Sequence, residues 1–269
     1  MEKQHRSLIV LQFFNVAAYV AVIIMNTLST VLPLNGRTAG EISDLLPSYF
    51  TPAGYTFSIW GAIYLALLGF TIYQALPRQR HPERQLLRRV GYLFVLSSVA
   101  NIGWLFAWHY GFYVISVVLM LALLVILIAI YLRLRVGHPD PSLTLADRLF
   151  GQLPFSLYLG WITVATIANV ASVAAHLGWD GFGIAGTVWS ASMMGVAVIV
   201  AGLLLWNRRN LAYAAVLVWA LFGIRAAYPD EPLIATVAPA AAALVAILAV
   251  VGYLRTRSAA PDPLPVGAR

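Results

Sequence analysis

The sequence predicts an all-α polytopic membrane protein, on three observations. Of the 269 residues, 61% are apolar and only 10% are charged, and the mean hydropathy is +0.82. Soluble globular domains are about 45–50% apolar and roughly 25% charged. The apolar residues gather in long stretches, and the basic residues gather in alternate connections between those stretches. A water-soluble single domain and a disordered chain are both excluded, because each needs far less apolar surface.

Eight apolar stretches each approach the roughly 20 residues that a helix needs to cross about 30 Å of hydrocarbon. They cover residues 8–32, 55–76, 90–109, 113–132, 153–175, 183–206, 211–227 and 234–254. The first stretch is too long for the apolar region of a signal peptide, so it is expected to be a retained helix.

The basic residues predict the orientation of these spans. If eight spans alternate in direction, fifteen of the seventeen Lys and Arg residues fall on one side, and only Arg37 and Arg225 fall on the other. Cytoplasmic loops carry the excess of Lys and Arg, so both termini are expected to be cytoplasmic. The net charge of +7 then reflects topology, and no nucleic-acid partner is expected.

The connections suggest how the chain is organised outside the spans. Residues 1–7 are expected to form a cytoplasmic head, and residues 258–269 are expected to form a flexible cytoplasmic tail. Most connections are short, but residues 33–54 form a loop of about 22 residues on the outer side, and loops of that length are usually functional. It is interpreted as a lid over a pocket, with a plain extramembrane loop as the alternative.

Residues missing from the spans exclude several kinds of chemistry. All ten acidic residues lie outside them, which disfavours ion-coupled transport, since an ion at membrane depth needs a compensating charge. The chain has no Cys and only five scattered His residues. No catalytic residue, metal site or required cofactor is therefore expected.

Aromatic and polar side chains at helical spacing mark a candidate ligand site. They fall on three spans, and at 1.5 Å per residue most lie about 8–15 Å below the outer ends of those spans. Asparagine in hydrocarbon is costly unless it is paired, so its amides either bridge helices or contact a ligand, and both roles are compatible. The candidates are Trp60, Tyr64, Asn101, Trp104, Tyr158, Trp161, Ala165, Thr166 and Asn169.

The place of the other tryptophans along the chain predicts their roles. Trp108, Trp179 and Trp206 lie at span ends or in a loop and are interpreted as anchors at the bilayer interface. Trp189 and Trp219 could be interfacial anchors or belong to a ligand site, and the sequence leaves both open.

The candidate residues carry a resemblance to the TspO/MBR family, the tryptophan-rich sensory proteins that include the mitochondrial translocator protein. The run from Pro52 through Trp60-Gly61 to Tyr64 is similar to the family's entry into its second helix, and Asn101-x-x-Trp104 is similar to its third-helix motif. The most specific block resembles the fifth-helix signature. It reads Tyr158-x-x-Trp161-x-x-x-Ala165-Thr166-x-x-Asn169.

The resemblance implies a TspO-like five-helix transmembrane bundle over residues 8–176, often dimeric, in a location expected to be a bacterial plasma membrane. It leaves residues 177–257 as an extension of three more transmembrane helices. It also implies a pocket under the first outer loop that binds tetrapyrroles such as protoporphyrin or haem.

Three functions follow as hypotheses. The leading one is a non-enzymatic sensory or translocator protein that binds a flat apolar ligand such as a porphyrin, in stress regulation or tetrapyrrole transport. The second is an ion-independent transporter of small apolar metabolites. The third is a light- or oxygen-dependent enzyme that degrades porphyrins, an activity implied by the family alone.

Overall fold

The computed structural model describes residues 2–258 except 33, 47, 81–85, 139, 207 and 209. Helices dominate this part of the chain. The main ones are α1 (Glu2–Val31), α3 (Ile59–Ala75), α5 (Leu93–His109), α6 (Tyr113–Arg133), α8 (Leu153–His176), α9 (Gly186–Trp206), α10 (Leu211–Ala227) and α11 (Pro232–Ser258). Short helices complete it: η1 (Leu34–Gly36), α2 (Ala39–Leu45), η2 (Gly54–Ser58), η3 (Pro77–Arg80), α4 (Leu86–Val90), α7 (Leu145–Asp147), the π-helical turn η4 (Arg148–Gln152) and η5 (Gly181–Gly183).

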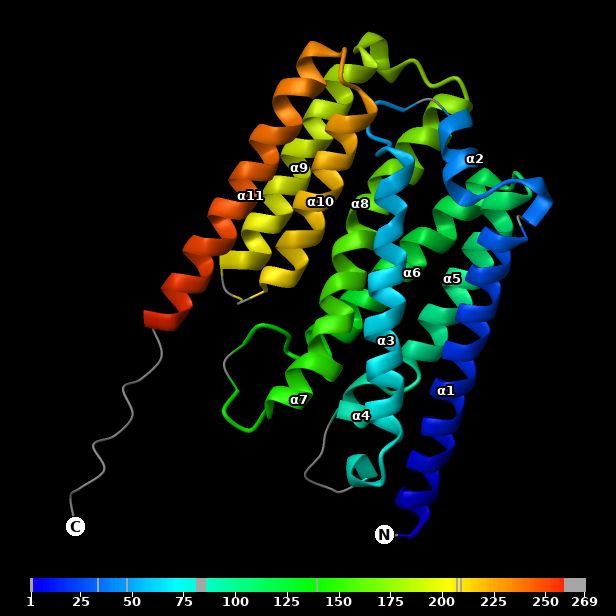
Figure 1. The fold of residues 1–269 in the computed structure, drawn as a ribbon, viewed down its shortest axis with the longest axis vertical. Coiled ribbons are helices and arrows are strands. Elements are labelled where there is room, and N and C mark those ends of the chain that lie inside the picture. Colours follow the sequence, from blue (N-terminus) through cyan, green and yellow to red (C-terminus); the bar gives the residue numbers. More distant parts are fainter. Residues whose placement is uncertain are drawn as a thin grey trace.

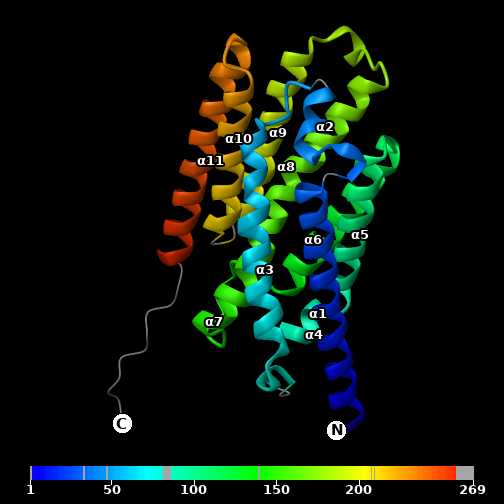
Figure 2. The ribbon, with the colours of Figure 1, turned by 45° about the vertical axis from the view of Figure 1, so that its right-hand side comes forward.

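The fold class predicted from the sequence is confirmed. Within the described residues, six helical segments are long and apolar enough to cross a membrane. Helices α5 and α10 are apolar but shorter, with 17 residues each, which is the lower limit for a spanning helix. Both lie alongside the longer helices in Figures 1 and 2. Each of the eight predicted spans therefore corresponds to one helix.

Several span boundaries differ from the prediction. Helix α1 already begins at Glu2, within the predicted head, and residues 259–269 of the predicted tail lie outside the described residues. Two of the differences have a visible local feature. The third span was expected to start at residue 90, but Gly91 adopts a φ of 54° and separates α4 from α5; a left-handed residue interrupts a helix, and glycine adopts it without steric cost. The fifth span was expected from residue 153, but its helical segment begins at Leu145. Pro154 lacks a backbone N–H, and the π-helical turn lies directly before it.

The helices form two groups joined through α8 and α10. Helices α1, α3, α5, α6 and α8 pack as one bundle, and α9, α10 and α11 pack as a second group beside α8 (Figure 1). The α8–α10 contact is close because Gly160 has no side chain: a Cβ there would lie 3.0 Å from Val216 Cβ and 3.2 Å from the Tyr213 carbonyl oxygen. One continuous cluster of buried apolar residues runs through both groups.

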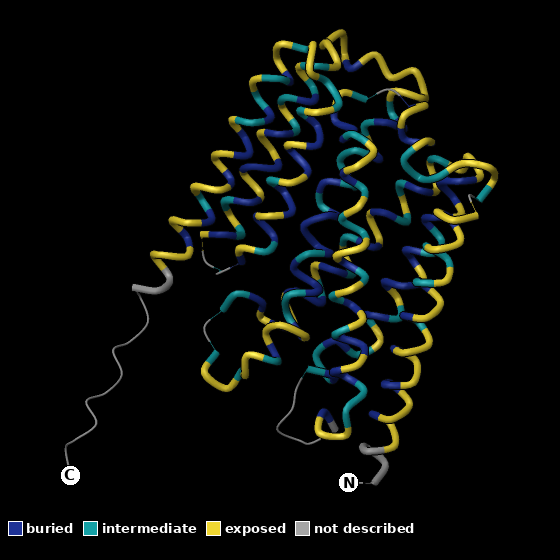
Figure 3. Tube along the Cα trace, viewed as in Figure 1, coloured by how far each residue is buried: buried dark blue, intermediate teal, exposed yellow. Residues whose placement is uncertain are grey.

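The outer surface of the helices is suited to a lipid bilayer. Figure 3 shows buried positions in the centre of the bundle and exposed positions along its outer helix faces. Many of the exposed side chains are large and apolar, as in Leu65, Val125 and Leu203, which are 71%, 64% and 73% exposed. A surface of this kind is stable only in contact with hydrocarbon.

The start of α1 and the end of α11 lie toward the same end of the molecule (Figure 1), as an even number of crossings requires. Which side of the membrane this end faces stays a prediction from the basic residues. We expect a cysteine at Ser142, in the exposed α6–α7 connection, to react with a membrane-impermeant maleimide only from the cytoplasmic side.

A cysteine at Arg37 or Asp180, at the opposite end, should react only from the outside. The chain has no native cysteine, so labelling of intact and permeabilised cells reads each position directly. Labelling of Ser142→Cys and Arg37→Cys from the same side would contradict the eight-span topology.

Candidate functional site

The segment expected to be a lid, described over residues 34–46 and 48–54 and called the lid below, is folded against the end of the bundle. A capping box starts α2: Thr38 N–H donates to Glu41 Oε2 at 2.7 Å, and Glu41 N–H donates to Thr38 Oγ1 at 3.3 Å. These hydrogen bonds hold the pKa of Glu41 below its usual range. Ile42 and Leu46 are buried beneath the helix. The sequence predicted the position of this segment but not α2 within it.

Stacked and edge-on aromatic rings lie beneath the lid. Trp60 stacks on Tyr64, with ring centroids 5.3 Å apart and planes inclined by 17°. The Trp60 ring also meets Trp161 edge-on at 6.2 Å, and Trp161 meets Phe57 at 5.7 Å. These contacts join the start of α3 to the middle of α8, so two of the three predicted blocks come together.

These rings surround two adjoining cavities. The first, the closed pocket, has a volume of about 40 Å³, enough for a small group. Its walls include five of the nine predicted ligand residues, Trp60, Trp104, Trp161, Ala165 and Asn169. The second, the lid cavity, has a volume of about 650 Å³ and lies between α1, the lid and α3. Ala39, Phe57, Trp60 and Trp104 line both cavities, so a ligand in one contacts the wall of the other.

The two predicted asparagines bridge helices. Asn169 accepts from Trp104 Nε1 at 3.3 Å and donates to Ser116 Oγ at 3.1 Å, which ties α8 to α5 and α6. Asn101 accepts from Asn26 on α1 at 3.0 Å. The bridging role expected for these amides is therefore present, and Asn169 also lines the closed pocket.

The remaining predicted residues occupy three different places. Tyr64 lines the lid cavity. Tyr158 is buried, with its ring 5.7 Å from Trp60 and edge-on to it, and it supports the pocket from behind. Thr166 donates its hydroxyl to the Ile162 carbonyl at 2.6 Å and lines a separate cavity between α8 and α9. Their roles toward a ligand stay predictions.

One polar group in this region, the indole Nε1 of Trp161, is buried and has no hydrogen-bond partner among the described residues. A buried donor without a partner costs about 1–3 kcal/mol. This group is available to a ligand that brings an acceptor.

The interpretation of Trp108 as an interfacial anchor is wrong. Trp108 is only 4% exposed, stacks on Trp104 at 5.9 Å and donates from Nε1 to the Ala39 carbonyl at 3.1 Å. It therefore lines the closed pocket and holds the lid. Its spacing of four residues from Trp104, which puts both on one helix face, was the signal in the sequence.

Several other wall residues were missed by the sequence analysis, among them Phe57 and Met120. Phe57 lies in η2 and Met120 in α6, and both line the closed pocket. Phe57 lies three residues before Trp60, and this spacing was a signal in the sequence. Met120 belongs to no spaced polar or aromatic pattern, so no sequence signal distinguished it from core residues.

The site offers stacking and hydrogen bonding rather than metal coordination. Within the described residues, no group of three or more His, Asp, Glu or Cys side chains could hold a metal ion. Glu41 and Asp44 are the charged residues of the lid cavity wall. Aromatic walls with a few polar groups are typical of pockets for apolar ligands.

The family follows from a comparison with protein-family models. The family described as TSPO-like protein matches residues 12–251. The match extends past residue 176, where the motif resemblance ended, and takes in most of α9, α10 and α11. No curated protein and no solved structure matches the chain. Because the family match covers most of the chain, on the same helices that assemble the aromatic site, this chain belongs to the TSPO-like protein family.

Proposed function

We propose that the protein binds a flat apolar ligand such as a porphyrin reversibly, with its rings against Trp60 and Trp104. The observation that carries this proposal is the lid cavity of about 650 Å³ next to stacked tryptophans. Its size falls within the 300–1,000 Å³ of ligand sites. Sensing or translocation in the membrane would follow from that binding.

The route of entry that fits this proposal lies between the lid and α1. The lid cavity is lined by Asn26, Thr27 and Thr30 of α1 and by Gly40 and Glu41 of α2. The closed pocket is almost filled by side chains, so the ligand would occupy the lid cavity and displace rings of the shared wall. Displacement needs lid movement rather than unfolding of the five-helix bundle.

Because Trp161 Nε1 has no protein partner among the described residues, we expect it to donate a hydrogen bond to the ligand. A Trp161→Phe variant removes the donor and keeps an aromatic ring. We expect protoporphyrin to bind this variant about three- to tenfold more weakly, since a neutral hydrogen bond contributes about 0.5–1.5 kcal/mol. Its thermal midpoint should not fall by more than a few degrees, because the lost donor had no protein partner.

The experiment is a titration of protoporphyrin followed by its own absorbance, with the protein in lipid nanodiscs. Porphyrin absorbance avoids the loss of signal that removing a tryptophan causes in fluorescence. Empty nanodiscs correct for partition into lipid, and Trp206→Phe, at the far end of α9, is the matched control. Wild-type protein without saturable binding would refute the porphyrin proposal. Equal affinity of Trp161→Phe and wild type would refute the role of Nε1.

A further inference from the structure

A second large cavity lies outside the aromatic site. It is bounded by α8, α9 and the residues around Tyr49, and its volume is about 760 Å³. None of its wall residues lines the closed pocket or the lid cavity. We call it the α8–α9 cavity, and the binding of a porphyrin under the lid leaves it unexplained.

The connection between α8 and α9 keeps these helices apart. Gly178, Gly181 and Gly183 have φ values of 77°, 65° and 74°, so the chain makes a wide turn that glycine permits. Trp189 Nε1 donates to the Gly181 carbonyl at 2.8 Å and fixes the turn onto α9. Helix α9 then packs mainly on α11, which leaves the space beside α8 open.

The long wall of the cavity is mostly apolar and combines alanines with larger aliphatic side chains. It runs along α8 from Thr166 to Ala175, a length of about 14 Å at 1.5 Å per residue. Ala171 and Ala174 leave the width, while Ile167 and Val170 supply apolar surface. Met193 of α9 lies opposite. This wall suits the apolar body of a ligand.

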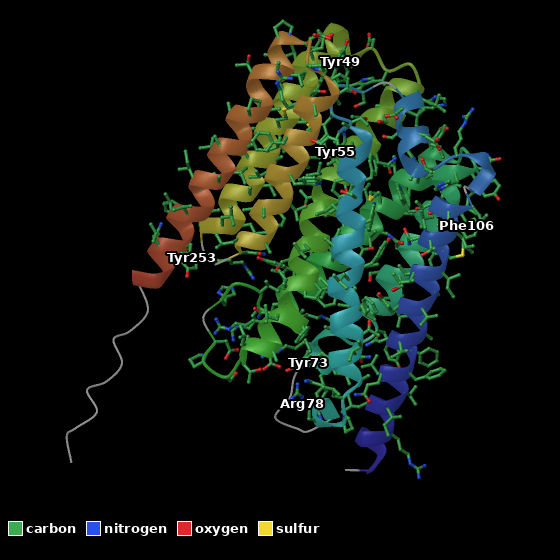
Figure 4. All side chains as sticks on the ribbon, viewed as in Figure 1. Tyr49, Tyr55, Tyr73, Arg78, Phe106 and Tyr253 are labelled. Atoms are coloured by element: carbon green, nitrogen blue, oxygen red, sulfur yellow. The ribbon has the colours of Figure 1, made fainter. Side chains whose placement is uncertain are left out.

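Aromatic rings and a carboxylate lie at the outer end of the cavity, near the connection between α8 and α9. Trp179 and Trp189 lie 5.2 Å apart, and Tyr49 and Tyr228 lie 5.3 Å apart. Tyr49 is at the end of the molecule that carries the lid (Figure 4). The carboxylate of Asp180 belongs to this wall and accepts from Phe182 N–H at 2.9 Å.

Asp180 is the charged residue of the described cavity wall. Among the described residues that line the cavity, none is Lys, Arg or His. Burial raises the pKa of Tyr228 to about 12, and the nearby Asp44 carboxylate adds to the rise. Asp44 itself lines the lid cavity, so Asp180 is the carboxylate that this cavity wall presents.

We propose that the α8–α9 cavity binds a lipophilic organic cation. The cationic centre lies among the tryptophan and tyrosine rings beside Asp180, and the apolar body lies along α8. Ring faces attract cations, and a carboxylate without a basic neighbour in the wall selects against anions of the same shape. A neutral lipid chain would use the apolar wall but not the charge.

The test compares tetraphenylphosphonium with tetraphenylborate, two ions of nearly identical shape and opposite charge. Binding of each to the protein in zwitterionic nanodiscs is measured by equilibrium dialysis, with empty nanodiscs as the blank. We expect saturable binding of the cation and none of the anion. Equal binding of both ions, or no saturable binding of the cation, would overturn the proposal.

Variants assign the binding to this cavity. Ala174→Phe should abolish saturable binding by filling the space, while Val200→Phe, on an exposed part of α9 outside the cavity, should leave it unchanged. Asp180→Asn keeps a side-chain oxygen that can accept from Phe182 N–H. It should lower the affinity for the cation by about three- to fivefold, the scale of an exposed ion pair. Asp230→Asn, an exposed acid outside the cavity wall, is its control.

Folding of each variant is checked by its thermal midpoint, and Ala171→Phe replaces Ala174→Phe if the latter unfolds. Cation binding that survives both fillers would overturn the assignment. Loss of cation binding in Trp60→Ala would indicate that the cation binds under the lid, and this result would also overturn the assignment to the α8–α9 cavity. Porphyrin binding need not change in Asp180→Asn, so this proposal and the proposed function can fail separately.

Discussion

Replacement of Trp60 by alanine is expected to weaken porphyrin binding by about 10- to 100-fold. Trp60 contacts Tyr64, Tyr158 and Trp161 and lines both adjoining cavities. Each aromatic pair contributes about 0.5–1.5 kcal/mol beyond area burial, and a ligand ring stacked on Trp60 would replace some of these pairs. A loss of about 1.4–2.8 kcal/mol corresponds to the stated range.

The measurement is the protoporphyrin absorbance titration in nanodiscs, with helix content checked by circular dichroism. Trp206→Ala is the control, since Trp206 is 50% exposed and packs against Arg255, with the guanidinium carbon 4.1 Å from the ring centroid. Unchanged affinity in Trp60→Ala would mean that the porphyrin does not rest on this ring. A similar loss in Trp206→Ala would indicate general damage to the protein.

Substitution of Gly223 by valine is expected to cause a large loss of stability. Gly223 lies on α10 where this helix meets η2, and a Cβ there would overlap Thr56 Oγ1 and lie 2.8 Å from Thr56 Cγ2. Thr56 is fully buried, so its side chain has no open space to move into without displacing neighbours. Overpacking of this kind costs about 1–3 kcal/mol, and separation of the two segments adds the loss of their hydrogen bonds.

Those hydrogen bonds connect the C-terminal helices to the ligand site. Ala53 N–H donates to the Gly223 carbonyl at 3.0 Å, and Trp219 Nε1 donates to the Thr56 carbonyl at 3.0 Å. The ring of Tyr55, whose position Figure 4 marks, meets Trp219 edge-on at 5.5 Å. Helix α10 therefore holds residues 53–58, which lead directly into Trp60.

The thermal midpoint of Gly223→Val should fall by several degrees, and the affinity for protoporphyrin should fall with it. Gly195→Val is the matched control, because a Cβ at Gly195 meets open space. The double variant Gly223→Val/Thr56→Ala should recover part of the loss, since it removes the overlapping atoms. A midpoint equal to that of Gly195→Val, or no recovery in the double variant, would contradict the proposed overlap.

The lid and the C-terminal helices thus act on the same site from two directions. Trp108 donates a hydrogen bond to Ala39 of the lid, and Trp219 of α10 donates one to Thr56 of η2, the turn that leads into α3. The sequence suggested a three-helix extension over residues 177–257, a division that stays a prediction. The contacts of α10 nevertheless give α9–α11 a structural role in positioning Trp60.

The amino-acid sequence by itself determined the class of protein, the number of spans and much of the aromatic wall. Apolar stretches of sufficient length form helices in a bilayer because the backbone must satisfy its own hydrogen bonds there. Side chains three or four residues apart share a helix face, so the pairing of Trp60 with Tyr64 was readable from their spacing.

Tertiary structure alone decided which face of each helix meets which neighbour. These helices are apolar on nearly all sides, so the contrast between polar and apolar faces that orients a soluble helix is missing. Close packing at glycines such as Gly160 and Gly223 sets the neighbours instead. For that reason Trp108 lies inside the site rather than at the interface, and Thr166 faces the α8–α9 cavity instead of the pocket lined by its neighbour Ala165.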